Sequence, residues 1–451
     1  METLFDACTL ARIQFAITAL YHYLFVPLSV GFGLILAIYQ TRAYRSKKDS
    51  DKAIANFWLK LFTGTFAVGV ATGITMEFSF GTNWADYSRF VGDIFGAPLA
   101  AEALLAFFLE SVFLGLLLFG KGRVSDKTLV VSGWLVWLGS CLSALWIIIA
   151  NSWMQTPAGY QVITNENGAS QAVLTNFFEA AFNPSTLARY SHTVLALLIT
   201  GALVCIAIGA YYKLKNREEK FGLSMIRTGT AVGIVCCILM IPAAHSQAVV
   251  VCENQPAKLA AMEGQWESGP SDLSFIGWVD EENQVTYALS IPGGTSFLAT
   301  FDFSTPYVGL NDLPDEQKPE ALNAIFQSYH WMVAMIGFIG IVLLLGLIMS
   351  FGGLKKSRKA LRLMQFSWLF PIIAIELGWM TAEIGRQPWI VYNELATADA
   401  YSLAVDPVSL IITLVLFLAI YGVIYFVWAR NFLGIVKEGP SSFAPNADKN
   451  R

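Results

Sequence analysis

Charge is what this sequence has least of. Charged residues make up 14% of its 451 residues, and hydrophobic residues make up 55%. An ordinary soluble domain is roughly 25% charged, so the composition excludes a chain whose whole surface faces water. The net charge of −4 is small, and we expect no nucleic-acid partner.

Cysteine is also scarce, and its spacing lacks the pairs that hold metals. The six cysteines include no CxxC pair and no cluster with histidine, which argues against a zinc or iron–sulfur site. The opening residues, METLFDACTL, lack the basic stretch and the small-residue cleavage site of a secretory signal. We therefore expect the N-terminus to remain in the mature protein.

Long apolar runs are what the sequence has instead. Each run is about 20 residues or longer, which is the length a helix needs to cross a hydrocarbon core of roughly 30 Å. Backbone groups in lipid must bond to one another, so these runs predict helices and an all-α, polytopic membrane protein. Nine transmembrane helices are predicted, at residues 12–40, 56–80, 95–120, 128–153, 185–212, 222–245, 326–352, 364–391 and 406–432.

Lysine and arginine gather in every second loop, whereas residues 154–184 and 390–405 contain neither. By the positive-inside rule the basic loops are cytoplasmic, so we expect the N-terminus outside and the C-terminus in the cytoplasm. The basic loops carry Arg42, Arg45, Lys47, Lys48 and Lys52; Lys121, Arg123 and Lys127; Lys213, Lys215, Arg217 and Lys220; and Lys355, Lys356, Arg358, Lys359 and Arg362.

One connection differs from the others. Residues 246–323 are polar, acidic and rich in glycine and proline, yet they contain eight aromatic residues, which predict a folded cap. The chain is thereby divided into helices 1 to 6 (residues 1–245), an extracytoplasmic loop (246–323), helices 7 to 9 (324–435) and a cytoplasmic tail (436–451).

Several polar side chains lie within the predicted spans, where a charged or imidazole group costs several kcal/mol unless it is paired or ligated. His22 lies about nine residues into the first span, ~14 Å from its outer end. Five such residues share one depth zone toward the outer face. They are His22, Glu102, His192, Met332 and Glu383.

Two of these residues suit the axial positions of a haem. A neutral imidazole from His192 and a thioether from Met332 can close a six-coordinate iron, which favours electron transfer. His22 has no evident sixth partner, so an iron bound there keeps a position open for oxygen. Taken singly, a helical histidine is more often a packing residue, and a methionine is usually core filler.

Carboxylates recur on single helical faces. Glu102 and Glu110 are eight residues apart and suit a proton relay, although a structural pair explains them equally well. Glu376 and Glu383 are seven apart with Trp379 between them, and Arg386 follows one turn later, where it can bind Glu383 or a haem propionate. Close helix packing fully explains the GxxxG spacing of Gly69 and Gly73.

Five long stretches of this sequence closely resemble subunit I of cytochrome bd-type quinol oxidases. They are RIQFAITALYHYLFVPLS (12–29), GVATGITMEFSFGTNW (69–84), GDIFGAPLAAEALLAFFLES (92–111), SALWIIIANSWMQTP (143–157) and GWMTAEIGRQPW (378–389).

The resemblance implies a role for each candidate residue. His22 resembles the axial ligand of one active-site haem, and Glu383 resembles the residue associated with the other. His192 and Met332 resemble the ligands of a low-spin haem b that accepts electrons from quinol. The remaining matches are the carboxylates Glu102 and Glu110 with Ser143 on a proton path, and Lys258 and Glu263 of QPAKLAAMEGQWE in quinol oxidation.

The resemblance also implies cofactors and partners. We expect a low-spin haem b, a high-spin haem b, and a haem d or further haem b, in a terminal oxidase of the bacterial inner membrane that oxidises ubiquinol or menaquinol outside and reduces O2 to water with cytoplasmic protons. A second integral membrane subunit is expected, and a small single-helix subunit is a further candidate. The short outer loop resembles the short-loop, often cyanide-insensitive, branch.

This chain departs from the family pattern at two histidines. His330 stands where the family more often has arginine, and His245 where an acidic residue is commoner. Two other classes of protein also carry intramembrane polar groups. A secondary transporter binds no haem, and the di-haem anchor of a quinone-linked dehydrogenase shows only low-spin haem b.

Overall fold

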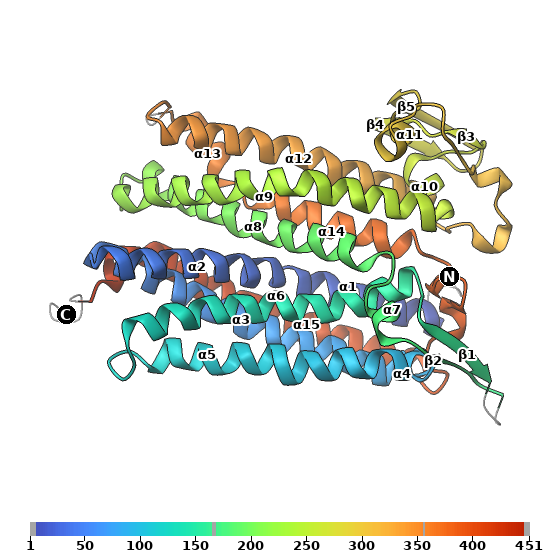
Figure 1. Cartoon of the computed structure of the whole chain (residues 1–451), viewed down its shortest axis with the longest axis horizontal. Helices are drawn as coiled ribbons and strands as arrows, with labels where there is room; N and C mark the ends of the chain where they lie inside the picture. Colours follow the sequence, from blue (N-terminus) through green and yellow to red (C-terminus); the bar gives the residue numbers. More distant parts are fainter. Residues whose placement is uncertain (1–5, 165–167, 355–356, 446–451) are drawn as a thin grey trace.

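A computed structural model of the protein describes residues 6–164, 168–354 and 357–445. Within these ranges nine helical segments of 27 to 40 residues are long and apolar enough to cross a membrane. The nine predicted spans and the mostly helical fold are thus confirmed. Figure 1 shows the long helices running side by side as an elongated bundle.

The spans are not all single helices. The first, third and eighth each consist of consecutive segments. In chain order the helices are α1 (Ala7–Tyr23) with α2 (Val26–Ser46), α3 (Asp49–Thr82), α4 (Ala85–Ala101) with the π-helix η2 (Glu102–Phe107) and α5 (Phe108–Phe119), α6 (Asp126–Gln155), α8 (Thr186–Leu214), α9 (Glu219–Asn254), α12 (Leu322–Ser350), α13 (Arg358–Gln365) with α14 (Leu369–Ile384), and α15 (Pro407–Glu438).

The break in the first span has a local cause. Pro27 lies in the first turn of α2, and proline cannot donate the backbone hydrogen bond that a continuous helix would need at that position. The chain therefore ends α1 at Tyr23 and restarts at Val26. His22 consequently sits in the last turn of one helix rather than inside a longer one.

The most buried span is α8, and the most exposed is α15. Contact between α2 and α8 depends on two glycines: a Cβ added to Gly31 would lie 2.6 Å from the Cα of Gly201. Such a distance leaves no room for a side chain, so the two central helices approach backbone to backbone. The peripheral helices present their apolar residues outward, as lipid-facing helices do.

The predicted basic loops lie together at one end of the bundle, with the C-terminal part of the chain, and the N-terminal part lies at the opposite end (Figure 1). Lys355, Lys356 and residues 446–451 of the predicted tail fall outside the described residues. Which end faces the cytoplasm remains a prediction.

Between α9 and α12 the chain forms a folded unit, which we call the cap (residues 256–321) (Figure 1). α9 continues to Asn254, past residue 245, where the sequence predicts the sixth span to end. The cap contains α10 (Pro256–Glu263), β3 (Gly269–Pro270), β4 (Leu273–Asp280), β5 (Val285–Ile291), α11 (Gly294–Thr300), β6 (Pro306–Tyr307), η3 (Leu310–Asp312) and η4 (Asp315–Gln317).

Short antiparallel pairs of strands, which the apolar pattern does not predict, occur at the cap end of the bundle. Within the cap, β4 pairs with β5 and β3 with β6. Other connections contain β1 (Tyr160–Thr164) paired with β2 (Ser170–Leu174), α7 (Phe177–Ala181), β7 (Trp389–Val391) paired with β8 (Leu395–Ala396), η5 (Thr397–Asp399) and, after α15, η6 (Pro440–Phe443).

Candidate functional site

His22 is held from one side by α3. Its Nδ1 lies 2.8 Å from the hydroxyl of Thr72, and a Cβ added to Gly73 would lie 3.2 Å from His22 Cε1. A Cβ added to Gly69 would meet Ser29 Oγ at 3.4 Å, so the GxxxG pair does support close packing, as predicted. Because Nδ1 is engaged by the hydroxyl, Nε2 is the nitrogen left to bind a metal, and Thr72 orients the ring.

The predicted ligands His192 and Met332 lie on α8 and α12, and α14 packs against both helices. A Cβ added to Gly378 on α14 would lie 3.0 Å from Met332 Sδ, so the absence of a side chain there makes room for the thioether. His192 Nδ1 is buried and has no hydrogen-bond partner in the part of the chain that the structure describes. Such an atom needs a partner that the protein itself does not provide.

Glu383 joins three spans. Its Oε1 accepts a hydrogen bond of 3.1 Å from Asn151 Nδ2 on α6, and its Oε2 lies 2.6 Å from Arg386 Nη2. Arg189 on α8 donates to Asn151 Oδ1. The Glu383–Arg386 pair was among the predicted alternatives. Sequence reasoning missed Arg189 and Asn151, although a charged arginine inside the fifth predicted span was a signal.

Positive charge exceeds negative charge around Glu383. Arg189 and Arg386 are 8% and 5% exposed, and Arg386 Nε and Nη1 and Arg189 Nε have no hydrogen-bond partner among the described residues. A buried ionised donor without a partner costs more than a neutral one. The arrangement therefore fits an anion with several carboxylate oxygens, such as the propionates of a haem.

Trp379 lies beside this cluster. Its ring is 5.7 Å from the guanidinium carbon of Arg189 and 4.8 Å from the ring of Tyr23. Glu376, two turns before Glu383 on α14, has both carboxylate oxygens buried and without a partner in the described ranges. The predicted stripe of Glu376, Trp379 and Glu383 therefore faces the interior of the bundle, but only Glu383 is paired.

Glu102 and Glu110 both meet α6. Ser143 Oγ donates to Glu102 Oε1 at 2.7 Å, and a Cβ added to Gly139 would lie 2.7 Å from Glu110 Cγ. Glu102 begins the π-helix, which the sequence did not predict. Insertions of this kind often occur at functional sites. The three residues predicted for a proton path thus lie along one interface between two spans.

Lys258 and Glu263 lie on α10 but do not contact each other. Lys258 is 3% exposed, and its Nζ donates to Gln155 Oε1 (2.6 Å) and Gln255 Oε1 (2.7 Å). Burial, followed by the nearby charge of Arg189, lowers the pKa of Lys258 well below its usual value. The cap thereby places an amine next to the Arg189–Glu383–Arg386 cluster.

Glu263 faces the other side of α10. Its Oε1 accepts a hydrogen bond of 2.9 Å from Thr295 Oγ1, and its Oε2 lies 3.8 Å from His330 Nε2 on α12. Burial raises the pKa of Glu263 to about 8. Because His330 Nδ1 lies 2.7 Å from the carbonyl of Phe326, a neutral ring donates there and leaves Nε2 facing the carboxyl group. Sequence reasoning missed this contact.

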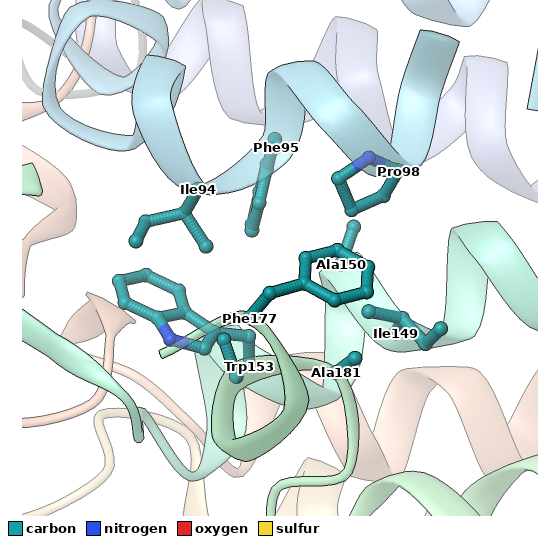
Figure 2. A pocket seen from close by; sticks show the side chains of 9 residues that line it. Ile94, Phe95, Pro98, Ile149, Ala150, Trp153, Phe177 and Ala181 are labelled. Carbon is teal, nitrogen blue, oxygen red and sulfur yellow. The ribbon is translucent and has the colours of Figure 1, made fainter. Parts of the chain in front are cut away.

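A small apolar pocket lies elsewhere, between α4, α6 and α7. Figure 2 shows its lining side chains, among them Phe95, Trp153 and Phe177. It includes none of the predicted haem ligands or carboxylates, so we do not assign it to the candidate site.

Comparison with known proteins identifies the family to which this chain is similar. The family model described as cytochrome bd terminal oxidase subunit I matches residues 10–440. The chain is 36% identical to cytochrome bd-II ubiquinol oxidase subunit 1 of Escherichia coli (strain K12), over 93% of this chain and 94% of that protein. It is also 36% identical to cytochrome bd ubiquinol oxidase subunit 1 of Bacillus subtilis (strain 168), over 95% and 93%.

A comparison with solved structures identifies the same family. The solved structure of the bd oxidase from Geobacillus thermodenitrificans matches with a TM-score of 0.88 and 27% identity, over 97% of this chain and 99% of the other. The match to the family model decides among the three classes that the sequence left open. This multi-pass membrane chain therefore belongs to the cytochrome bd terminal oxidase subunit I family.

Proposed function

We propose that this chain is the haem-bearing subunit of a quinol-oxidising, oxygen-reducing terminal oxidase of the bacterial inner membrane. The observation that carries the proposal is the set of buried guanidinium and imidazole nitrogens that lack partners among the described residues, at Arg189, Arg386 and His192. Their chemistry suits iron porphyrins with carboxylate tails.

The ligands are assigned as the sequence suggests. His192 and Met332 would hold a low-spin haem b. His22 would hold one active-site haem, and Glu383 would serve the other. One of these two would be a high-spin haem b, and the other a haem d or a further haem b. Bound there, these groups supply electron transfer and oxygen chemistry. The chain's own contribution is to orient the ligands, as Thr72 does for His22, and to neutralise propionates with Arg189 and Arg386.

Quinol oxidation releases two protons, and the cap offers an amine that can accept a proton and a carboxyl group, protonated at neutral pH, that can pass its proton on. Burial leaves Lys258 able to accept a proton because its pKa is lowered. The pKa of Glu263, at about 8, lies near the working pH, where proton transfer is most efficient. We place quinol at the cap on the outer side, as ubiquinol or menaquinol. The relatives described above are named ubiquinol oxidases, and a further relative of Bacillus subtilis, 30% identical, is named a putative menaquinol oxidase.

Protons for water formation would come from the cytoplasm. Glu110 and Glu102, with Gly139 and Ser143 of α6 beside them, provide carboxylates at two levels of the membrane. A second integral membrane subunit, and a small single-helix subunit, are the companions we propose. Short-loop branch membership and cyanide insensitivity remain predictions.

The ligand assignment is tested by His192→Ala and Met332→Ala, in the complex purified with its companions. Each variant should lose the low-spin haem b absorption while carbon monoxide still binds. His245→Ala is the matched control. His245 lies on the flank of α9 against Phe301 of the cap, so its loss should leave the spectrum unchanged. Survival of the low-spin spectrum in either ligand variant would show the assignment to be wrong.

A further inference from the structure

Four apolar side chains gather at and after α11, on the surface of the cap. We call Phe297, Leu298, Phe301 and Phe303 the aromatic patch. They are 36%, 46%, 73% and 52% exposed. The rings of Phe297 and Phe303 stack with centroids 4.4 Å apart, and Phe297 and Phe301 lie 6.0 Å apart. Exposed aromatic clusters of this kind usually mark a contact surface.

The patch reaches down the side of the bundle. The ring of Phe301 lies 5.6 Å from the ring of His245 on α9, whereas α9 continues to Asn254. Asn254 lies nine residues after His245, which corresponds to ~14 Å along the helix. The cap therefore does not only cover the end of α9 but also packs against its flank.

The position of His245 and Phe301 along α9 corresponds to the edge of the hydrocarbon core of the membrane. α9 begins at Glu219, and Lys220 and Arg227 in its first turns are exposed. Because about 20 residues cross the apolar core, the far boundary lies between about residues 241 and 247. Just before it, Ile238 and Ile241 are 61% and 71% exposed, as expected of a lipid-facing side. The aromatic patch is thus level with the end of an apolar surface that contacts lipid.

The backbone conformation of Phe301 also supports a role for its exposed ring. It follows α11 with φ +60° and ψ +20°, in the left-handed region that a bulky residue rarely adopts. This conformation is unfavourable for a residue with a bulky side chain, and the ring is 73% exposed. Burial of that ring in a non-aqueous surrounding would offset the cost.

We propose that the aromatic patch inserts into the membrane interface, so that phospholipid is its partner. Aromatic side chains favour the boundary between headgroups and acyl chains, and an apolar surface binds there by burial. Residues 293–303 contain one charged residue, Asp302, and no lysine or arginine. The contact therefore needs acyl chains rather than an anionic headgroup. The inference holds whether or not the chain oxidises quinol.

Site-specific photocrosslinking tests the proposal without relying on activity. p-Benzoylphenylalanine is placed at position 301 or, in a second variant, at position 298, and the whole complex is reconstituted in nanodiscs of phosphatidylcholine alone. Position 282 is the control, since Glu282 is exposed in the turn after β4 and the neighbouring Glu281 accepts from the backbone N–H of Asn323 at the start of α12.

After irradiation, mass spectrometry of the cap peptides should find one added phospholipid at positions 298 and 301 and none at 282. Replacing a third of the lipid by phosphatidylglycerol should leave the yield unchanged. Adducts with a second copy of the chain or with a companion subunit, or no lipid adduct at either patch position, would overturn the proposal. A yield that depends on anionic lipid would overturn the acyl-chain contact.

Discussion

The Glu263→Gln substitution should stabilise the folded protein while it slows quinol oxidation. The carboxyl group is 5% exposed, and its hydrogen-bond donors are Thr295 Oγ1 at 2.9 Å and the Ser274 N–H at 3.5 Å. Burial raises its pKa to about 8, and the negative charge of Asp272 acts in the same direction. The folded protein therefore holds the proton at neutral pH.

The magnitude follows from linkage between protonation and folding. Below pH 4.5 the carboxyl group is protonated in the folded and unfolded chain alike. Between pH 4.5 and about 8 the unfolded chain releases the proton and the folded chain does not, so folding stability falls as pH rises. At ~1.4 kcal/mol per pH unit, the cost at pH 7 is about 3 kcal/mol. Glutamine cannot ionise, so it removes this cost.

Thermal unfolding of the purified complex between pH 5 and 8 measures the effect. The wild-type Tm should fall with rising pH more steeply than that of Glu263→Gln, and the variant should be the more stable at pH 7. Glu282→Gln is the control, because Glu282 is exposed in the same cap. Parallel pH profiles for wild type and Glu263→Gln would refute the reasoning, as would a variant that oxidises quinol at the wild-type rate.

Three further substitutions test the bundle. Thr72→Val removes the hydroxyl beside His22 Nδ1 and should weaken haem retention there by about 10-fold or more, as measured by pigment extraction. Thr75→Val is the control, since the Thr75 hydroxyl donates to the carbonyl of Ala71 in its own helix. Arg386→Lys keeps the charge but loses the planar fork, and should shift a haem midpoint potential in redox titration, with Arg89→Lys, on the exposed side of α4, unchanged. Gly139→Ala forces a Cβ to 2.7 Å from Glu110 Cγ and should cost about 1–3 kcal/mol of stability and slow oxygen reduction, whereas Gly115→Ala, with open space around it, should do neither in thermal and oxygen-uptake assays.

Some features of the fold could be predicted because lipid restricts the choices. Uninterrupted apolar runs must become helices in lipid, so the nine spans followed from the positions and lengths of these runs. The break after Tyr23 was not predicted, although Pro27, in the first turn of α2, gave a signal for it. The π-helix at Glu102 had no such signal, because the residues that follow Glu102 in it are apolar and include no proline or glycine.

Some residues of the candidate site could likewise be predicted from the sequence, and others could not. A single residue at membrane depth, such as His192, attracts notice because its burial is costly. Its lateral neighbours depend on helix rotation and packing, which one sequence does not encode in any local pattern. The Asn151–Arg189 contact joins α6 and α8, and the approach of His330 to Glu263 joins α12 and the cap. Neither contact could be predicted from sequence spacing.

The absorption spectrum of the detergent-purified complex, recorded as reduced minus oxidised and again with carbon monoxide, tests the central claim most directly. We expect a low-spin haem b signal that carbon monoxide does not change, together with a second haem signal that carbon monoxide shifts. A colourless complex, or one in which every haem is low-spin and unreactive toward carbon monoxide, would show that the chain is not the haem-bearing subunit of an oxygen-reducing oxidase.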